Sequence, residues 1–126
     1  MKKILIVIAD YYKDISSSLL KSAKNNLNNF SLKIIRVPGV FEIPVTISKN
    51  IKKYDAFIAL GCVIKGETPH FDFISSASTH AIMNLSVVSK KPIGNGIITC
   101  LNMKQAKARG KKGEEAAQAI ISVLSQ

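Results

Sequence analysis

The chain has 126 residues, 47% of them hydrophobic, and its 18 Lys and Arg against 8 Asp and Glu give a formal net charge of +10. This length predicts one domain, residues 1–126, and the apolar content indicates a globular rather than a disordered chain. A basic surface can attract nucleic acid, but aromatic residues make up only 6% of the chain. Because no basic stripe with aromatics or recognition helix is present either, we expect no nucleic-acid function.

Targeting, membrane and metal signals are weak. No apolar run reaches membrane-spanning length, and the apolar start at Ile4 stops at Asp10 without a small-residue cleavage site. We therefore expect a cytoplasmic protein with no membrane segment. Cys62 and Cys100 form no CxxC motif and are predicted to be buried free thiols of a reducing compartment. Two histidines and two cysteines at these spacings predict no metal centre.

Short β-branched runs alternate with amphipathic segments along the chain. The predicted strands are residues 4–9, 32–37, 57–64 and 93–99. The predicted helices begin at Asp14, at Glu42 and Pro44, at Thr68 and Pro69, and near Met103, the last with an interruption at residues 110–113. Asp14 and Thr68 are the expected N-caps. The alternation predicts a flavodoxin-like three-layer α/β/α sandwich with a parallel sheet of about four strands.

Ligands of such folds bind beyond the carboxyl ends of the strands. The segments predicted there are Tyr11 with Tyr12, residues 39–42, residues 61–70 and the region after Asn95. The third segment reads GCVIKGETPH, in which Gly66 lets backbone N–H groups approach a ligand and the following helix start favours an anion. His70 in the first helical turn could accept and return protons, or could simply cap or pack.

Three other groups of polar residues each allow a functional and a structural interpretation. His80 lies ten positions after His70, about 15 Å further along the helix, and is predicted to be a surface or packing residue. A basic run around Lys104–Lys112 is usually a solvated helix face, but Arg109, one of only two arginines, could bind phosphate with two N–H groups. Glu42 could accept hydrogen bonds from ligand hydroxyls or complement a helix dipole.

Two motifs carry a family resemblance. VPGVFEIP at residues 37–44 and GCVIKGETPHFD at residues 61–72 resemble corresponding segments of the lumazine synthases of riboflavin biosynthesis, and NGIIT at residues 95–99 with Gln105, Ala106 and Arg109 resembles their fourth strand and last helix. The matches run in order over nearly the whole chain.

The resemblance implies a reaction. It implies a transferase that condenses 5-amino-6-(D-ribitylamino)uracil with 3,4-dihydroxy-2-butanone 4-phosphate to 6,7-dimethyl-8-ribityllumazine and releases phosphate. It implies no redox or metal cofactor. It also implies a pentamer-based homo-oligomer with sites shared between subunits. The sequence does not decide between a pentamer, a decamer and a sixty-subunit capsid. Riboflavin synthase is implied as a further partner.

Residue roles follow from the same resemblance. His70 is the implied proton-transfer residue, and Tyr11 the aromatic that stacks on the pyrimidine. Glu67 and Thr68 are implied to hold the phosphate substrate together with Arg109 of a neighbouring subunit, with Lys112 as a second phosphate contact. The implied ring and ribityl pocket is formed by Val40, Phe41, Glu42, Cys62, Val63, Ile64 and, from the next subunit, position 95.

Three departures from the family are visible. Tyr11-Tyr12 stands where Phe-Asn is common, Asn95 stands where a pocket-closing phenylalanine is common, and the segment after Arg109 is shorter. Asparagine weakens stacking and is expected to lower pyrimidine affinity.

These departures leave a non-catalytic, flavin-binding or shell-forming relative as an alternative. A phosphoacceptor receiver domain is a further alternative, but it needs an aspartate at the end of the third strand, where the chain has Leu60-Gly61-Cys62. The archaeal-type riboflavin synthases share the fold, but the VPGVFEIP segment favours lumazine synthase.

Overall fold

The computed structural model describes residues 1–126 and contains a four-stranded, all-parallel sheet. The strands are β1 (Lys3–Ala9), β2 (Ser31–Val37), β3 (Ala56–Ile64) and β4 (Ile93–Cys100), arranged in the order β2-β1-β3-β4. The helices are α1 (Lys13–Lys24), η1 (Val40–Glu42), α2 (Ile43–Lys49), α3 (His70–Ser89), α4 (Met103–Lys107) and α5 (Lys112–Leu124). The predicted fold is confirmed, and each strand boundary lies within one residue of its predicted position.

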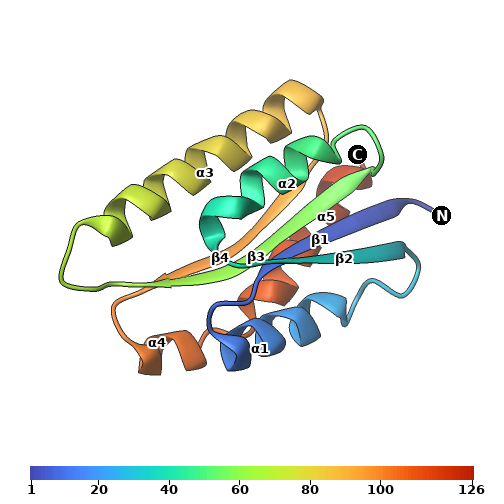
Figure 1. Ribbon diagram of the computed structural model, residues 1–126. Helices are drawn as coiled ribbons and strands as arrows, with labels where there is room; N and C mark the ends of the chain where they lie inside the picture. Colours follow the sequence, from blue (N-terminus) through green and yellow to red (C-terminus); the bar gives the residue numbers. More distant parts are fainter.

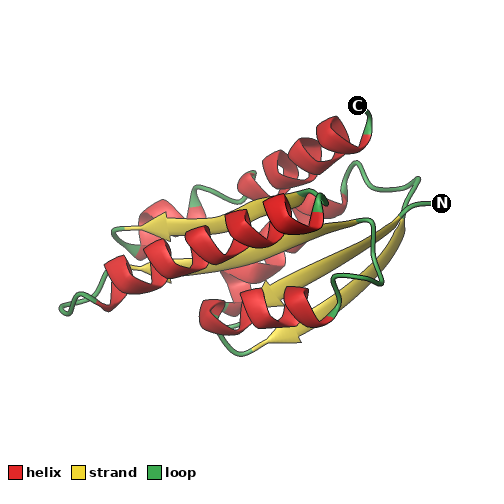
Figure 2. Ribbon diagram, turned by 90° about the horizontal axis from the view of Figure 1, so that it is seen from above, coloured by secondary structure: helices red, strands yellow, loops and turns green.

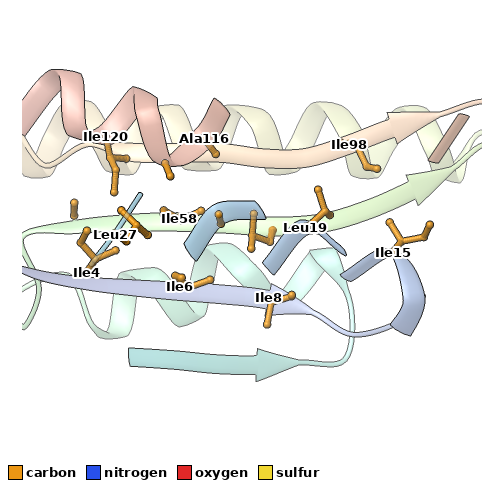
Figure 3. Close-up of a cluster of buried hydrophobic side chains, with 14 of the residues drawn as sticks. Ile4, Ile6, Ile8, Ile15, Leu19, Leu27, Ile58, Ile98, Ala116 and Ile120 are labelled. Carbon is orange, nitrogen blue, oxygen red and sulfur yellow. The ribbon is translucent and has the colours of Figure 1, made fainter. Parts of the chain in front are cut away.

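The helices form two layers that cover opposite faces of the sheet (Figures 1 and 2). Helices α1 and α5 pack on one face, where sixteen buried residues form a cluster with side chains from β1, β3 and β4 (Figure 3). Helices α2 and α3 pack on the other face over a second cluster of twelve buried residues. Both chain termini lie at the end of the molecule opposite the carboxyl ends of the strands (Figure 1).

The central position of β1 and β3 in the sheet explains why their sequences are continuously apolar. Residues 4–9 of β1 and 56–61 of β3 are buried without interruption, because helices cover both faces of the sheet at these positions. The edge strand β2 is only partly buried and carries Lys33 and Arg36 among its apolar residues. None of the helices combines the length and apolar character needed to cross a lipid bilayer.

Two predicted helix caps are wrong. Helix α1 has Tyr12 as its N-cap, whose carbonyl accepts from Ser16 N at 2.9 Å, so Asp14 lies within the first turn. Helix α3 has Pro69 as its N-cap, whose carbonyl accepts from Phe73 N at 3.2 Å. In each case the first helical carbonyl, and not the nearest capping side chain, decides where the helix begins. Asp14 still suits the positive end of α1.

Helix α5 lies unusually close to β4 and α1. A Cβ atom at Gly94 would collide with the Ala116 carbonyl, and one at Gly113 would collide with the Leu19 carbonyl. The Ser22 hydroxyl of α1 donates to Gly110 O at 2.6 Å and accepts from Glu114 N at 3.0 Å. These contacts fix the start of α5 against α1 and thereby fix the segment that contains Arg109.

Candidate active site

A hollow of about 580 Å³ opens beyond the carboxyl ends of β1 and β3. It brings together seven residues that the sequence predicts for the site, which are Tyr11, Val40, Phe41, Cys62, Val63, Ile64 and His70. It also contains Tyr12 and Gly39, which were expected at the strand ends without an assigned role, and Ile74, which was not predicted for the site. The lining is mostly apolar with a few polar groups, which is typical of small-molecule sites.

Tyr11 and Tyr12 form an aromatic pair on one side of the hollow. Their ring centroids lie 4.8 Å apart with an interplanar angle of 73°, an edge-to-face arrangement. Tyr11 is 74% exposed, so one face of its ring is free for a ligand, whereas Tyr12 is half-buried and packs on the core cluster beneath α1.

The turn that carries the aromatic pair is held by Asp10. Its backbone N–H donates to Val37 O at 3.0 Å, and its carboxylate accepts from Arg36 Nη1 at 3.0 and 3.1 Å and from Ser16 Oγ at 3.1 Å. One carboxylate therefore joins the ends of β1 and β2 to the first turn of α1. The positions of Tyr11 and Tyr12 follow from this junction.

The thiol of Cys62 lines the hollow, while Cys100 is buried beside it. Both cysteines are free, as predicted, but Cys62 is only half-buried where full burial was expected. Burial, and to a lesser extent the neighbouring Cys100, raises the pKa of Cys62 to about 12 against the lowering effect of Arg109. Cys62 is therefore a neutral thiol at physiological pH and offers the hollow a soft apolar wall instead of a nucleophile.

His70 is the first residue of α3, and its side chain lines the hollow. The loop before it begins where Lys65 N donates to Cys100 O at 2.9 Å, and Glu67 and Thr68 are exposed. The Thr68 hydroxyl accepts from His70 N at a long 3.4 Å. No atom lies within 4 Å of the place that a Cβ on Gly66 would occupy. Loop and helix start therefore leave room for an anion beside the hollow, although Glu67 and Thr68 do not line it.

Glu42 lies in a neighbouring hollow of about 410 Å³ between α2 and α3. Phe41 and Ile74 line both hollows, so the two are adjacent. Ile74 was missed although it lies four residues after His70 on the same helical face, a spacing that could have predicted it. Gly39 was expected at the end of the second strand but was given no role. Glu42 is therefore next to the main hollow without lining it.

Asn95 and Arg109 lie outside the hollow of their own chain. Asn95 lies within the predicted strand 93–99, as the third residue of β4, and pairs with Ala59 in the middle of β3. Its Oδ1 accepts from Ile97 N at 3.1 Å. Arg109 follows α4 and donates from Nη1 to Thr99 O at 3.2 Å. The family resemblance implied that both residues reach the hollow from a neighbouring subunit.

The fold and the hollow define the class. The chain is a flavodoxin-like α/β protein with a mostly apolar hollow beyond the carboxyl ends of its parallel strands, where ligands of such folds bind. The family model of 6,7-dimethyl-8-ribityllumazine synthase matches residues 1–126. The chain therefore belongs to the 6,7-dimethyl-8-ribityllumazine synthase family, and this membership supports a transferase function in riboflavin biosynthesis.

Curated relatives agree with this assignment. The chain is 43% identical over 136 residues to "6,7-dimethyl-8-ribityllumazine synthase 1" of Rhodopseudomonas palustris, an alignment that covers 97% of this chain and 83% of the relative. It is 44% identical over 133 residues to the 6,7-dimethyl-8-ribityllumazine synthase of Bartonella bacilliformis, covering 97% of this chain and 88% of the relative. This level of similarity over the full length decides against a receiver domain.

Proposed function

We propose that this chain condenses 5-amino-6-(D-ribitylamino)uracil with 3,4-dihydroxy-2-butanone 4-phosphate to 6,7-dimethyl-8-ribityllumazine. One observation carries the proposal. In a chain of this family, a single hollow is lined by an exposed aromatic ring, a strand end and a histidine, and it lies next to a loop that can bind an anion. Two flat or anionic substrates could meet there in one orientation. Holding both reactants in this way can account for much of the rate gain.

The pyrimidine substrate would lie against the apolar part of the hollow. Tyr11 supports this placement because its ring is 74% exposed and can stack on a flat heterocycle. The end of β3, at Cys62, Val63 and Ile64, would lie along the edge of the ring. The ribityl chain would extend past Val40 and Phe41 towards Glu42, whose carboxylate can accept hydrogen bonds from hydroxyl groups.

The phosphate substrate would bind at the loop before α3. Backbone N–H groups of residues 66–68 and the positive end of a twenty-residue helix favour an anion there. Thr68 would add a hydroxyl, and Glu67 would contact the substrate. We assign the guanidinium of the phosphate site to Arg109 of a neighbouring copy, because Arg109 does not line the hollow of its own chain. Lys112 would be a second phosphate contact.

The chemistry requires proton transfer at several steps. The pyrimidine amine attacks the ketone of the second substrate, water leaves to form an imine, phosphate is eliminated, and a second loss of water closes the ring. His70 lines the hollow and would move protons between the substrates. The substrates and products balance without an external oxidant or reductant, so we assign no cofactor.

We further propose that residues 1–126 form one domain that assembles into a homo-oligomer based on pentamers, in the cytoplasm. Large apolar side chains on the outer faces of α2 and α3 support an assembly: Val45, Phe73, Met83, Val87 and Val88 are each at least 58% exposed. Riboflavin synthase, which would consume the product, is a further proposed partner. Native mass spectrometry of the purified protein tests the assembly, and a monomer at micromolar concentration would contradict it.

The deciding experiment is the formation of lumazine from the two substrates, followed by fluorescence. Because the two substrates also condense slowly without enzyme, the rate must be compared with a protein-free blank. We expect a rate far above the blank that saturates with both substrates. A rate equal to the blank would exclude the proposed activity.

A further inference from the structure

Tyr12 lines the hollow, although the sequence comparison with the family assigned it no role. Its backbone position is fixed, because its carbonyl accepts the first hydrogen bond of α1 from Ser16 N. Its ring packs on the buried cluster beneath α1 and stands edge-on to Tyr11. The ring is therefore held from behind while part of it faces the space that a ligand would enter.

The hydroxyl of Tyr12 is free to bind a ligand. It makes no hydrogen bond with another group of the chain, and it is not sealed from solvent. Burial raises the pKa of Tyr12, and Tyr11 and Cys62 raise it further. The phenol is therefore protonated at neutral pH and available as a hydrogen-bond donor. A half-buried donor without a partner loses free energy unless a ligand or water satisfies it.

The location of Tyr12 identifies the substrate that it would meet. Tyr12 and Cys62 line the same hollow, whereas Gly66, Glu67 and Thr68 of the phosphate loop do not line it. The phosphate loop therefore lies outside the space that the Tyr12 ring faces. The pyrimidine substrate, in contrast, would lie beside Tyr11 and Cys62. It carries two ring carbonyl oxygens that accept hydrogen bonds at its edge.

We propose that the Tyr12 hydroxyl donates a hydrogen bond to the polar edge of the pyrimidine substrate and thereby sets the affinity for that substrate. The inference rests on the proposed function, since that function places a pyrimidinedione in the hollow. Tyr11 then provides a face for the ring, and Tyr12, oriented at 73° to it, provides a polar contact at the edge.

The test is Tyr12→Phe, which removes the hydroxyl and keeps the packing of the ring. We expect the KM for the pyrimidine substrate to rise about 3- to 10-fold, the loss typical of one hydrogen bond. The KM for the phosphate substrate should stay unchanged. Tyr54→Phe is the matched control, because Tyr54 packs on the opposite core cluster against Phe57 and should change neither value. An unchanged pyrimidine KM, or an equal rise in both KM values, would overturn the proposal.

A binding measurement separates this proposal from the proposed function. Calorimetric titration with an unreactive ribityl-pyrimidinedione that lacks the 5-amino group needs no turnover. A weaker Kd for Tyr12→Phe than for the unchanged protein supports the role of Tyr12 even if lumazine formation does not exceed the blank. Equal Kd values refute that role even if the enzyme is active. If Tyr12→Phe does not fold, Tyr12→His is the second variant, because it keeps a ring with a hydrogen-bonding edge. We expect Tyr12→His to weaken the pyrimidine Kd less than 3-fold. Complete loss of binding would count against the proposal.

Discussion

Arg109 donates from Nη1 to the carbonyl oxygen of Thr99 at 3.2 Å. The guanidinium is thereby held across the end of β4, while the arginine as a whole remains exposed. A planar guanidinium has five N–H donors, so the bond to Thr99 leaves others for a phosphate. A surface arginine anchored at one nitrogen loses less conformational freedom when it binds an anion than one that is unrestrained.

Replacement of Arg109 by alanine tests the phosphate assignment. We expect Arg109→Ala to raise the KM for the phosphate substrate about 10- to 100-fold, because a charge-assisted hydrogen bond is lost. The KM for the pyrimidine should change little. Steady-state kinetics with each substrate varied in turn measures both values. Lys107→Ala, which removes a neighbouring exposed charge, is the control, and an unchanged phosphate KM in Arg109→Ala would remove this residue from the site.

Replacement of His70 tests the proton-transfer role. We expect His70→Ala to lower kcat about 10- to 100-fold without abolishing turnover, because orientation of the two substrates would persist. His80→Ala is the matched control: His80 is an exposed histidine of the same helix and lines neither of the hollows around Phe41. Equal rates for His70→Ala and the unchanged enzyme would show that His70 transfers no proton in the rate-limiting step.

The close approach of α5 to α1 predicts a stability effect. Gly113→Ala should lower the unfolding temperature by about 5–15 °C, because the new methyl group would collide with the Leu19 carbonyl. Alanine otherwise favours a helix by about 1 kcal/mol, so a decrease means that the collision outweighs this gain. Thermal unfolding followed by circular dichroism measures the effect. Gly66→Ala is the control: residue 66 has open space around it, so this variant should unfold at the temperature of the unchanged protein. An unchanged unfolding temperature of Gly113→Ala would mean that α5 can move away from α1.

The raised pKa of Cys62 predicts slow alkylation. With a pKa of about 12, roughly one thiol in ten thousand is a thiolate at pH 8, and only the thiolate reacts with iodoacetamide. We expect both cysteines to label slowly in the folded protein and quickly in urea. Labelling should accelerate as the pH rises, since deprotonation follows the high pKa. Mass spectrometry at fixed times provides the measurement, and rapid labelling of Cys62 at pH 7 would contradict the burial that raises its pKa.

The sequence predicts the strands well because a buried parallel strand leaves a strong signal. Residues 4–9 and 57–64 are continuous apolar runs, and no helix of this chain produces such a pattern. The helix starts were harder, since Asp14 and Thr68 have the chemistry of caps but the carbonyls of Tyr12 and Pro69 make the first helical bonds. Capping preferences are weaker than the geometry imposed by the preceding turn.

The sequence predicted the site residues that lie at the ends of strands, and it did not predict those whose place depends on packing between elements. Residues at or beside the ends of β1, β2 and β3 line one hollow because parallel strands end at one edge of a sheet. Tyr12 was expected at a strand end but was given no role, because two adjacent aromatic residues give no sign of which one is half-buried. Asn95 belongs to the expected set through the family resemblance, and Arg109 through its guanidinium as well. Neither residue lines the hollow of its own chain.

Asn95 and Arg109 also affect the outer border of β4, which is a free edge of the sheet. Pro92 O accepts from Phe57 N of β3, and Cys100 O accepts from Lys65 N directly after β3. The backbone groups of alternate residues such as Ile97 and Thr99 therefore point away from the sheet. Asn95 occupies the outward N–H of Ile97, and Arg109 occupies the outward carbonyl of Thr99. Exposed edge strands invite pairing with other chains and lead to aggregation. Asn95 and Arg109 thus leave fewer free backbone groups on this border for pairing with a strand of another chain.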